Sequence, residues 1–391
     1  MNKRDFLKKL SIAGATSIVP ISMRASAPET LALKRPIHRM LGRTGIKVPV
    51  ISSGRVSLNN DNLVKALFKS GIKLFDSGLV YADGKNDAKL GEMVKVFGRK
   101  NNVICSKVML DYDLKEKKFR SGDIQEEFEK KLNQILSCMK EEYLDILFIH
   151  DARCSDQVNH PDVLAAMEKA KKVGKARFLG VSSHENVTEV VGAACDAKIY
   201  DVVLMSYNYR SGQDVKDAFA RASKGGLGTI AMKSMAGYWV DKEKTIPVNK
   251  SAAMKYILQD ENVHTVIKSF SSFDDISLFT SLMYDLKMTE KEKSDIELTR
   301  QYAGLYCIGC GLCRPLCPKG LSVPDLMRGY MYTYGYGEPS RGRSLVLKNG
   351  ITETTCIDCV ICMVKCSMGF PVNDRIRDIA RLRNISDDFL A

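Results

Sequence analysis

Two runs of cysteines near the C-terminus have the spacing expected of iron–sulfur ligands. Residues 307–318 read CIGCGLCRPLCP, in which three cysteines follow at two-residue gaps and a fourth comes three residues later. Residues 356–366 read CIDCVICMVKC and repeat this spacing. A cubane needs several thiolates from one tight loop, and two-residue gaps turn successive sulfurs toward a common point. Each run therefore predicts a [4Fe–4S] cluster.

Structural zinc and disulfide bonds are the alternatives for these cysteines. Zinc sites usually take four ligands from separated C-x-x-C pairs, which three evenly spaced cysteines match poorly. Cysteines this close in sequence rarely reach disulfide geometry. One departure from the iron–sulfur pattern is Ser367, which follows Cys366 where a proline is common. Four cysteines lie outside the runs and are expected to be structural thiols: Cys105, Cys138, Cys154 and Cys195.

Together, the two runs resemble a bacterial ferredoxin with two [4Fe–4S] clusters. In that arrangement, three cysteines of one run bind one cluster and the fourth binds the other. The resemblance implies these ligands for the first cluster: Cys307, Cys310, Cys313 and Cys366. It implies these for the second: Cys356, Cys359, Cys362 and Cys317. We expect a small α-rich, ferredoxin-type domain with a linker helix over residues 286–391.

The composition is that of a globular protein with a basic surface. The chain has 391 residues, 45% of them apolar, and a formal net charge of +13. This length allows a large core and a smaller module. We find no base-reading motif and no stripe of basic and aromatic residues, which argues against nucleic-acid binding. The positive charge would instead steer an acidic partner protein.

The first 27 residues have the features of an export signal. Residues 2–8, NKRDFLK, resemble the twin-arginine motif, with Lys3 in place of the first arginine. A short apolar stretch over 10–21 and an A-x-A pattern at 25–27 follow. The stretch is too short for an ordinary spanning helix, and no other segment is apolar enough. We predict a signal peptide at 1–27 and a periplasmic protein; a disordered basic tail on a cytoplasmic protein is the alternative.

From about residue 39 the sequence alternates between strands and helices, after a polar hairpin expected to turn at Gly45. Strands are predicted over residues 48–51, 73–76, 103–108, 144–149, 178–181, 202–205, 229–232 and 264–267. Helices are predicted over residues 62–69, 86–96, 124–139, 162–172, 187–194, 215–222, 250–258 and 273–283. Eight such units predict a (β/α)8 TIM barrel over residues 36–285. A doubly wound α/β sheet is the alternative, but no Gly-x-Gly-x-x-Gly follows the first strand.

The segment that contains the cysteine runs also carries helical and loop patterns. We predict a tether helix within 288–306, a helix over 324–334 and a closing helix over 372–382. The glycine-rich GYGEPSRGR at 335–343 predicts a loop. Tyrosines alternate at Tyr330, Tyr332, Tyr334 and Tyr336, and we expect them to pack against the barrel.

Four polar residues fall at the C-terminal ends of successive strands, where TIM barrels place their chemistry. They are Asp76, Tyr81, Lys107 and His150. A tyrosine with a pKa near about 10 is a poor acid at neutral pH. A nearby ammonium such as Lys107 lowers that pKa by stabilising the phenolate. Tyr81 would then protonate a substrate oxygen, with Asp76 holding Lys107 and His150 orienting the carbonyl.

In these segments the chain resembles the aldo/keto reductase family. The resemblance rests on RMLGRTGIKVPVI, GIKLFDSGLVYADGKNDAKLGEMV, VICSKV, YLDILFIHD, GKARFLGVSSH, YDVVLMSYN and GLGTIAMKSMAG, which occur in the family's order between about residues 39 and 283. A branch of the family with a C-terminal ferredoxin-type domain accounts for the rest. The resemblance implies that the four polar residues are the catalytic tetrad and that the substrate is a small carbonyl compound or alcohol.

The family's nicotinamide contacts match this chain only in part. The resemblance assigns them to Ser182, Ser183, Asn208, Lys233, Lys268 and Ser269. Leu204 replaces a glutamine that holds the carboxamide, and Met232 replaces a stacking aromatic residue. Asp274 stands where an arginine would bind a 2′-phosphate, so NADPH is disfavoured more than NADH. We predict an exported iron–sulfur oxidoreductase with a redox partner protein. The alternatives are an electron carrier whose barrel is a docking scaffold and an enzyme that keeps a trapped nicotinamide.

Overall fold

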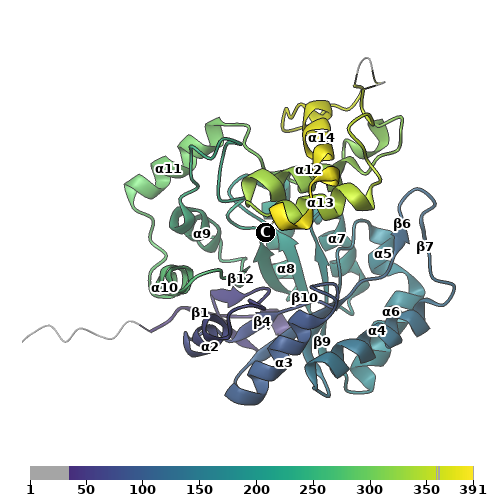
Figure 1. Cartoon of the computed structure of the whole chain (residues 1–391). Helices are drawn as coiled ribbons and strands as arrows, with labels where there is room; N and C mark the ends of the chain where they lie inside the picture. The colour runs from purple at the N-terminus through teal and green to yellow at the C-terminus, as the bar shows by residue number, and fades with distance from the viewer. Residues whose placement is uncertain (1–34, 358, 360–361, 391) are drawn as a thin grey trace, which may run out of the picture. The chain divides into compact units, whose positions relative to one another are not determined.

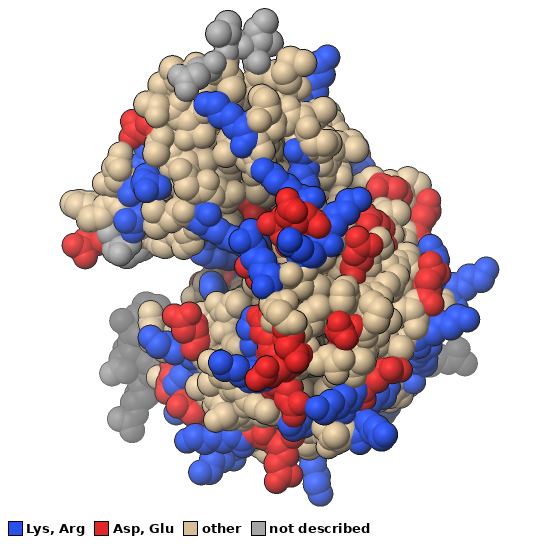
Figure 2. All heavy atoms as spheres, turned by 90° about the vertical axis from the view of Figure 1, so that its right-hand side faces the viewer, with Lys and Arg blue, Asp and Glu red and all other residues tan. Residues whose placement is uncertain are grey.

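The computed structural model describes residues 35–357, 359 and 362–390. The predicted signal peptide at 1–27 lies outside the described residues. From Pro36 onward the chain forms one compact unit. Among the helices that the structure describes, none is both long enough and apolar enough to cross a membrane. On the face drawn in Figure 2, lysine and arginine are interspersed with aspartate and glutamate rather than gathered in one stripe.

In the described part of the chain, eight parallel strands close into a barrel, with each strand beside the next in sequence order (Figure 1). They are β3 (Ile51–Ser53), β4 (Leu74–Asp76), β5 (Val103–Val108), β8 (Leu144–Ile149), β9 (Ala176–Ser183), β10 (Val202–Ser206), β11 (Gly228–Met232) and β12 (Thr265–Lys268). The barrel closes where β12 pairs with β3, with Val266 opposite Ile51 and Lys268 opposite Ser53. The predicted TIM barrel is confirmed.

Helices follow the strands on the outside of the barrel (Figure 1). They are α2 (Asp61–Lys69), α3 (Lys85–Phe97), α4 (Ile124–Met139), α6 (Pro161–Lys172), α7 (Val187–Ala197), α8 (Gln213–Lys224), α9 (Lys250–Leu258) and α10 (Phe273–Ser281). Shorter elements are β6 (Tyr112–Asp113), β7 (Lys118–Phe119) and α5 (Ser155–Asn159). Capping residues define several helix starts: the Asp123 side chain accepts a hydrogen bond from Glu126 N, and that of Asn249 from Ala252 N. The predicted bounds of α4 and α9 match for this reason.

A hairpin closes the N-terminal end of the barrel. Its strands β1 (His38–Met40) and β2 (Lys47–Pro49) pair antiparallel, and Gly45 turns the chain with a φ of 72°. Leu41 and Val48 from the hairpin are fully buried in the barrel interior. A Cβ at Gly228 would lie 2.6 Å from the Leu41 side chain, so the glycine leaves the space that Leu41 occupies. The opposite end of the barrel therefore remains for function.

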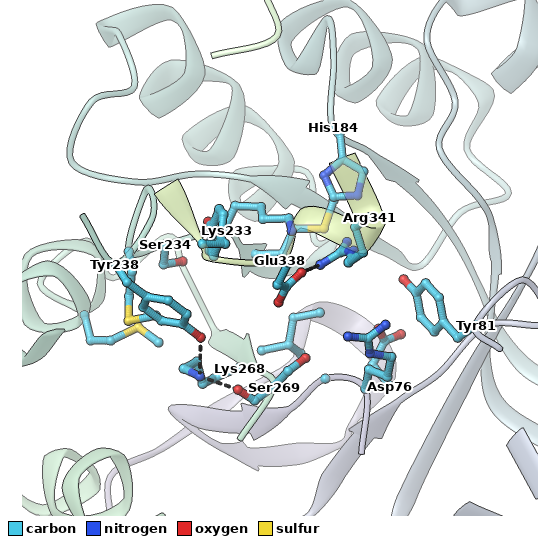
Figure 3. A pocket seen from close by; sticks show the side chains of 17 residues that line it. Asp76, Tyr81, His184, Lys233, Ser234, Tyr238, Lys268, Ser269, Glu338 and Arg341 are labelled. Atoms are coloured by element: carbon cyan, nitrogen blue, oxygen red, sulfur yellow. Dashed lines mark hydrogen bonds and ion pairs between the residues drawn. The ribbon is translucent and has the colours of Figure 1, made fainter. Parts of the chain in front are cut away.

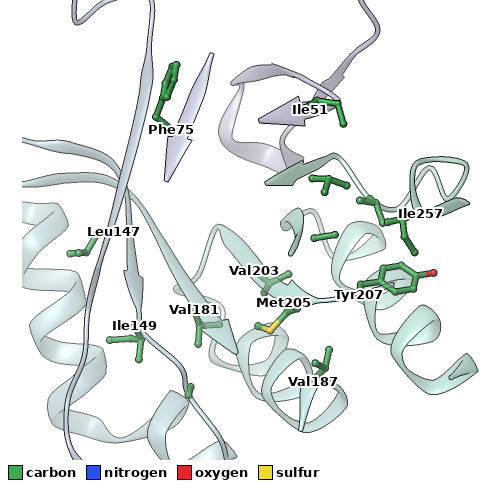
Figure 4. Packing of buried hydrophobic residues seen from close by; sticks show 14 of the residues in the cluster. Ile51, Phe75, Leu147, Ile149, Val181, Val187, Val203, Met205, Tyr207 and Ile257 are labelled. Carbon is green, nitrogen blue, oxygen red and sulfur yellow. The ribbon is translucent and has the colours of Figure 1, made fainter. Parts of the chain in front are cut away.

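Successive side chains of each strand point alternately into the barrel and outward to the helices, so the barrel domain has an inner and an outer hydrophobic core. In β8, Ile146 and Phe148 point into the barrel, whereas Leu147 and Ile149 pack against the surrounding helices. Figure 4 shows part of this outer core. Leu204, which replaces the family's glutamine, belongs to the barrel interior and is fully buried. Close packing inside fixes the strand ends on which the polar residues lie.

The C-terminal segment lies over the C-terminal ends of the strands (Figure 1). It consists of α11 (Glu290–Gln301), α12 (Val323–Tyr330), a π-helical turn η4 (Met331–Gly335), α13 (Pro339–Lys348) and α14 (Val372–Ala380). The helices predicted within 288–306, from 324 and from 372 are present. The loop predicted over 335–343 is wrong in its second half, because α13 begins at Pro339. Proline suits the first position of a helix, and Gly342 lets α13 pack closely on Gly329 of α12.

The alternating tyrosines divide between two faces. The Lys233 Nζ lies 4.6 Å from the ring centre of Tyr332 and 4.9 Å from that of Tyr336, at the end of the barrel. The ring centres of Tyr330 and Tyr334 lie 4.7 Å apart. The Nζ of Lys242, a barrel residue, lies 4.8 Å from the ring centre of Tyr334. A spacing of four residues in a helical turn puts each pair on one face. The expected packing against the barrel is thus found for three of the four.

Candidate active site and cluster sites

The four predicted tetrad residues come from three neighbouring strands. Asp76 ends β4, and Tyr81 lies in the turn that follows it; Lys107 lies near the end of β5, and His150 directly follows β8. Because the strands are parallel, these positions meet at one end of the barrel. Figure 3 shows Tyr81 and Asp76 next to each other at the edge of a cavity.

A buried ion pair forms the base of this site. The Lys107 Nζ lies 2.5 Å from Asp76 Oδ2 and donates a second hydrogen bond to the Ser77 carbonyl. Asp76 is 3% exposed and Lys107 is 2% exposed, so both charges are largely shielded from bulk water. The Lys107 Nζ also lies 5.1 Å from the ring centre of Tyr81, whose ring meets His150 edge-on at 5.6 Å. The structure therefore brings all four residues together.

Burial and neighbouring charges set the protonation of the tetrad. Burial raises the pKa of Tyr81 above its ordinary value, and Lys107 opposes this only in part. The predicted direction of the Lys107 effect is correct, but the net lowering that we expected is wrong, because burial disfavours the charged phenolate. Burial, helped by Lys107, lowers the pKa of His150 to about 3. His150 is therefore neutral at physiological pH.

Beside Tyr81 lies a cavity of about 130 Å³ that is continuous with solvent. Three residues predicted to contact a nicotinamide line it, namely Lys233, Lys268 and Ser269. Asp76 and Tyr81 of the tetrad line the cavity together with these three residues (Figure 3), and Lys107 and His150 lie behind them.

The other three predicted nicotinamide contacts do not line this cavity. The Ser182 hydroxyl donates to Ile149 O at 3.1 Å, and the Ser183 hydroxyl donates to the Glu185 carbonyl. Asn208 is buried, and its side-chain oxygen accepts from Arg210 N at 3.0 Å. These side chains stabilise the loops after β9 and β10 instead.

Lys268, predicted to bind a cofactor phosphate, is one of two lysines that share the carboxylate of Asp275; Lys250 Nζ lies 2.9 Å from Asp275 Oδ1. Lys268 Nζ lies 3.6 Å from Asp275 Oδ2, and it donates to Tyr238 OH at 3.3 Å and to the Ser269 carbonyl. Burial lowers the pKa of Lys268 to about 8, which Asp275 partly counters. Asp274, singled out from the sequence, is exposed, and the contact of Asp275 with Lys268 was not predicted. The Lys268 ammonium is therefore already engaged by a carboxylate and by two oxygen acceptors.

The C-terminal segment contributes residues to the same cavity, which sequence reasoning missed. Tyr336, Glu338 and Arg341 line it together with Tyr81 and Asp76. Glu338 and Arg341 form an ion pair on the first turn of α13 (Figure 3). The sequence shows a charged EPSR segment after the alternating tyrosines, but it does not indicate that this segment lies at the barrel's cavity.

Two further cavities, both in the C-terminal segment, are surrounded by cysteines. The first is lined by Cys307, Cys310, Cys313 and Cys366, and the second by Cys317, Cys356, Cys359 and Cys362. The fourth cysteine of each run thus lines the cavity of the other run, as the ferredoxin resemblance implies. Within the described residues, no three His, Cys, Asp or Glu side chains converge on a single ion. Four thiolates around a cavity suit a cubane, in which each binds a different iron.

The loop after β9 lies between the first cluster cavity and the cavity beside Tyr81. Asn186 N donates to Gly309 O at 2.9 Å, which joins the loop after β9 to the first cysteine run. A Cβ at Gly309 would lie 2.4 Å from His184 O, and the side chain of His184 lines the tetrad cavity. Arg314 forms an ion pair with Glu185 of the same loop. The first cysteine run is therefore the one next to the barrel site.

Comparisons with known proteins agree with this organisation. Residues 58–252 match the aldo/keto reductase family, and residues 306–371 match the 4Fe-4S dicluster domain. The chain joins an aldo/keto reductase domain to a dicluster domain. Below, "dicluster domain" denotes the C-terminal segment that carries both cysteine runs.

Individual relatives support the fold rather than a particular reaction. The chain is 26% identical to L-galactose dehydrogenase of Arabidopsis thaliana over 161 residues, which is 37% of this chain and 47% of that protein. The holo form of an aldo-keto reductase from Bacillus halodurans covers 68% of this chain and 96% of its own, with 18% identity and a TM-score of 0.55. An aldo/keto reductase from Klebsiella pneumoniae, solved with NADP and acetate, covers 67% and 95%, with 17% identity and a TM-score of 0.51. The chain spans about half the length of the curated relatives it matches.

Proposed function

We propose that this protein is an oxidoreductase that interconverts a small carbonyl compound and its alcohol, with Tyr81 as the proton donor. The observation that carries the proposal is the meeting of Asp76, Lys107, Tyr81 and His150 at one end of the barrel, where Asp76 and Tyr81 line a cavity. Taken singly, each residue has a structural explanation. Their convergence at the C-terminal end of the barrel is the arrangement that general acid catalysis needs.

Each residue of the tetrad would have a separate role in the reaction. The carbonyl oxygen accepts hydrogen bonds from the Tyr81 hydroxyl and from His150, which is neutral and therefore leaves the proton transfer to Tyr81. Reduction of the carbonyl takes two electrons and two protons. Tyr81 gives its proton to the oxygen as negative charge develops there, and the proton that forms the C–H bond comes from solvent, with which the cavity is continuous. Lys107, held by Asp76, stabilises the phenolate that remains.

We infer that electrons reach this site through the dicluster domain. The cysteines of the two cavities would hold two [4Fe–4S] clusters, which together would supply the two electrons that reduction of a carbonyl requires. Two observations favour this source over NADPH: Ser182, Ser183 and Asn208 do not line the cavity, and Lys268 is already paired with Asp275. The first cysteine run lies against the loop that carries His184. A redox protein that docks on the dicluster domain would then be the electron donor.

Product analysis tests the proposal. Cluster-loaded protein is incubated without oxygen with a panel of aldehydes and ketones, and with NADH, NADPH or a chemical reductant. We expect alcohol formation with the chemical reductant, and none that depends on NADPH. A protein that forms no alcohol from any compound, yet passes electrons to an acceptor protein, would instead be an electron carrier whose barrel is a scaffold.

We also propose that the protein is exported through its twin-arginine-like N-terminus. The proposal rests on Lys3, Arg4 and the A-x-A pattern at 25–27. Changing both Lys3 and Arg4 to glutamine is expected to keep the protein in the cytoplasm, because the transporter reads this pair. Cell fractionation measures this, and periplasmic protein at unchanged levels in the double variant would refute export by this route.

A further inference from the structure

Arg341 belongs to the dicluster domain but lies in the barrel's site. It is on the first turn of α13, lines the same cavity as Tyr81 and lies close to it in Figure 3. Its guanidinium carbon lies 3.8 Å from the ring centre of Tyr332, and it forms an ion pair with Glu338. Stacking and ion pairing together fix the guanidinium at the edge of the cavity.

The charges around Tyr81 come from both domains. The titratable groups near it are Asp76, Lys107 and His150 from the strand ends, and Arg341 and Tyr332 from the dicluster domain. The other charged groups that line the cavity are Arg55, Lys233, Lys268 and Glu338. After burial, Lys107 and Asp76 act most strongly on the pKa of Tyr81, in opposite directions, and Arg341 then lowers it. Because Asp76 offsets Lys107, the contribution of Arg341 is not redundant.

Packing ties the position of Arg341 to the first cluster cavity. Gly342 follows Arg341, and a Cβ there would lie 2.9 Å from Gly329 O of α12. On the same helix, Pro324 and Met327 line the first cluster cavity. Helix α12 therefore contacts both the first cluster cavity and α13, which carries Arg341.

We propose that Arg341 is a positioning residue for Tyr81, which favours the phenolate left after proton donation and makes the dicluster domain part of the barrel's active site. This rests on the proposed role of Tyr81 as the proton donor. In this arrangement the dicluster domain has two effects on the barrel: it supplies electrons, and it sets the pH range in which Tyr81 works.

Direct titration of Tyr81 tests this without depending on a substrate. 3-Fluorotyrosine is placed at position 81 of the full-length, cluster-loaded protein, and its 19F NMR shift is followed against pH. Arg341→Gln is expected to raise the measured pKa by about half a unit to one unit, a reduced effect because the Arg341 side chain is 36% exposed and water screens it. Arg341→Lys is expected to restore most of the difference. Lys348→Gln, which removes a charge from the exposed far end of α13, is expected to change nothing.

A second variant, with an expected pKa shift of the opposite sign, distinguishes an effect of charge from an effect of misfolding. Glu338→Gln removes the counter-charge of Arg341 and is expected to lower the pKa of the label at position 81. Iron content and visible absorption report whether each variant keeps its clusters. An unchanged titration in Arg341→Gln or in Glu338→Gln, with clusters intact, would overturn the inference. Shifted titrations in a protein that reduces no carbonyl would instead leave the inference standing and reject the proposed function.

Discussion

Replacing Tyr81 with phenylalanine is expected to lower carbonyl reduction by a factor of about 10² to 10⁴, the usual contribution of a general acid. This corresponds to about 3–5 kcal/mol of transition-state stabilisation. The change removes only the hydroxyl, and phenylalanine keeps the ring beside His150 and Lys107. We therefore expect substrate binding and cluster content to change little. Steady-state rates with the best substrate of the panel measure the loss.

Tyr143→Phe is the matched control for this substitution. Tyr143 precedes β8 and so lies at the opposite end of the barrel from His150, where Arg99 stacks on its ring at 4.2 Å. The same chemical change at this position is expected to leave the rate unaltered. If Tyr81→Phe retained full activity, Tyr81 would not be the proton donor and the tetrad would have a structural role.

Replacing Cys366 with alanine is expected to remove the first cluster, although Cys366 belongs to the second cysteine run. The reason is the crossing of ligands: Cys366 lines the first cavity with Cys307, Cys310 and Cys313. The neighbouring Ser367 hydroxyl lies 3.3 Å from Cys310 Sγ, which shows how far the second run reaches into the first cavity. Iron content is expected to fall by about half, since one of two cubanes is lost.

A set of paired variants identifies which cluster is lost. The electron paramagnetic resonance spectrum of reduced Cys366→Ala is expected to match that of Cys310→Ala, because both retain only the second cluster. The spectrum of Cys317→Ala is expected to match that of Cys359→Ala. If Cys366→Ala matched Cys359→Ala instead, each run would bind its own cluster and the crossed arrangement would be wrong.

The barrel was predictable because its signals are local. Each strand is a short apolar run and each helix has one buried face, so β5 and β8 have the predicted bounds. The tetrad could be placed because residues at the C-terminal ends of parallel strands must meet. The assignment of the fourth cysteine of each run to the other run's cluster followed from the cysteine spacing and from the resemblance to two-cluster ferredoxins.

The remainder of the site depends on contacts between distant segments. Arg341 is more than two hundred residues from Tyr81 in sequence, and its glycine-rich surroundings suggested a loop rather than the start of a helix. Asp275 neutralises Lys268 across a helix start, whereas the sequence comparison pointed to its exposed neighbour Asp274. The net pKa of Tyr81 depends on burial, which a list of neighbouring charges does not include.

A single-turnover experiment tests the central claim, that electrons from the clusters are used at the Tyr81 site. Cluster-loaded protein is reduced chemically without oxygen, freed of excess reductant and mixed with a carbonyl substrate, while visible absorption reports cluster oxidation and the alcohol is quantified. We predict that the clusters of the unmodified protein become oxidised, with one alcohol formed per two electrons lost, and that Tyr81→Phe shows neither change at the same rate. Clusters that stay reduced in the unmodified protein while alcohol forms, or that become oxidised equally fast in Tyr81→Phe, would contradict the account.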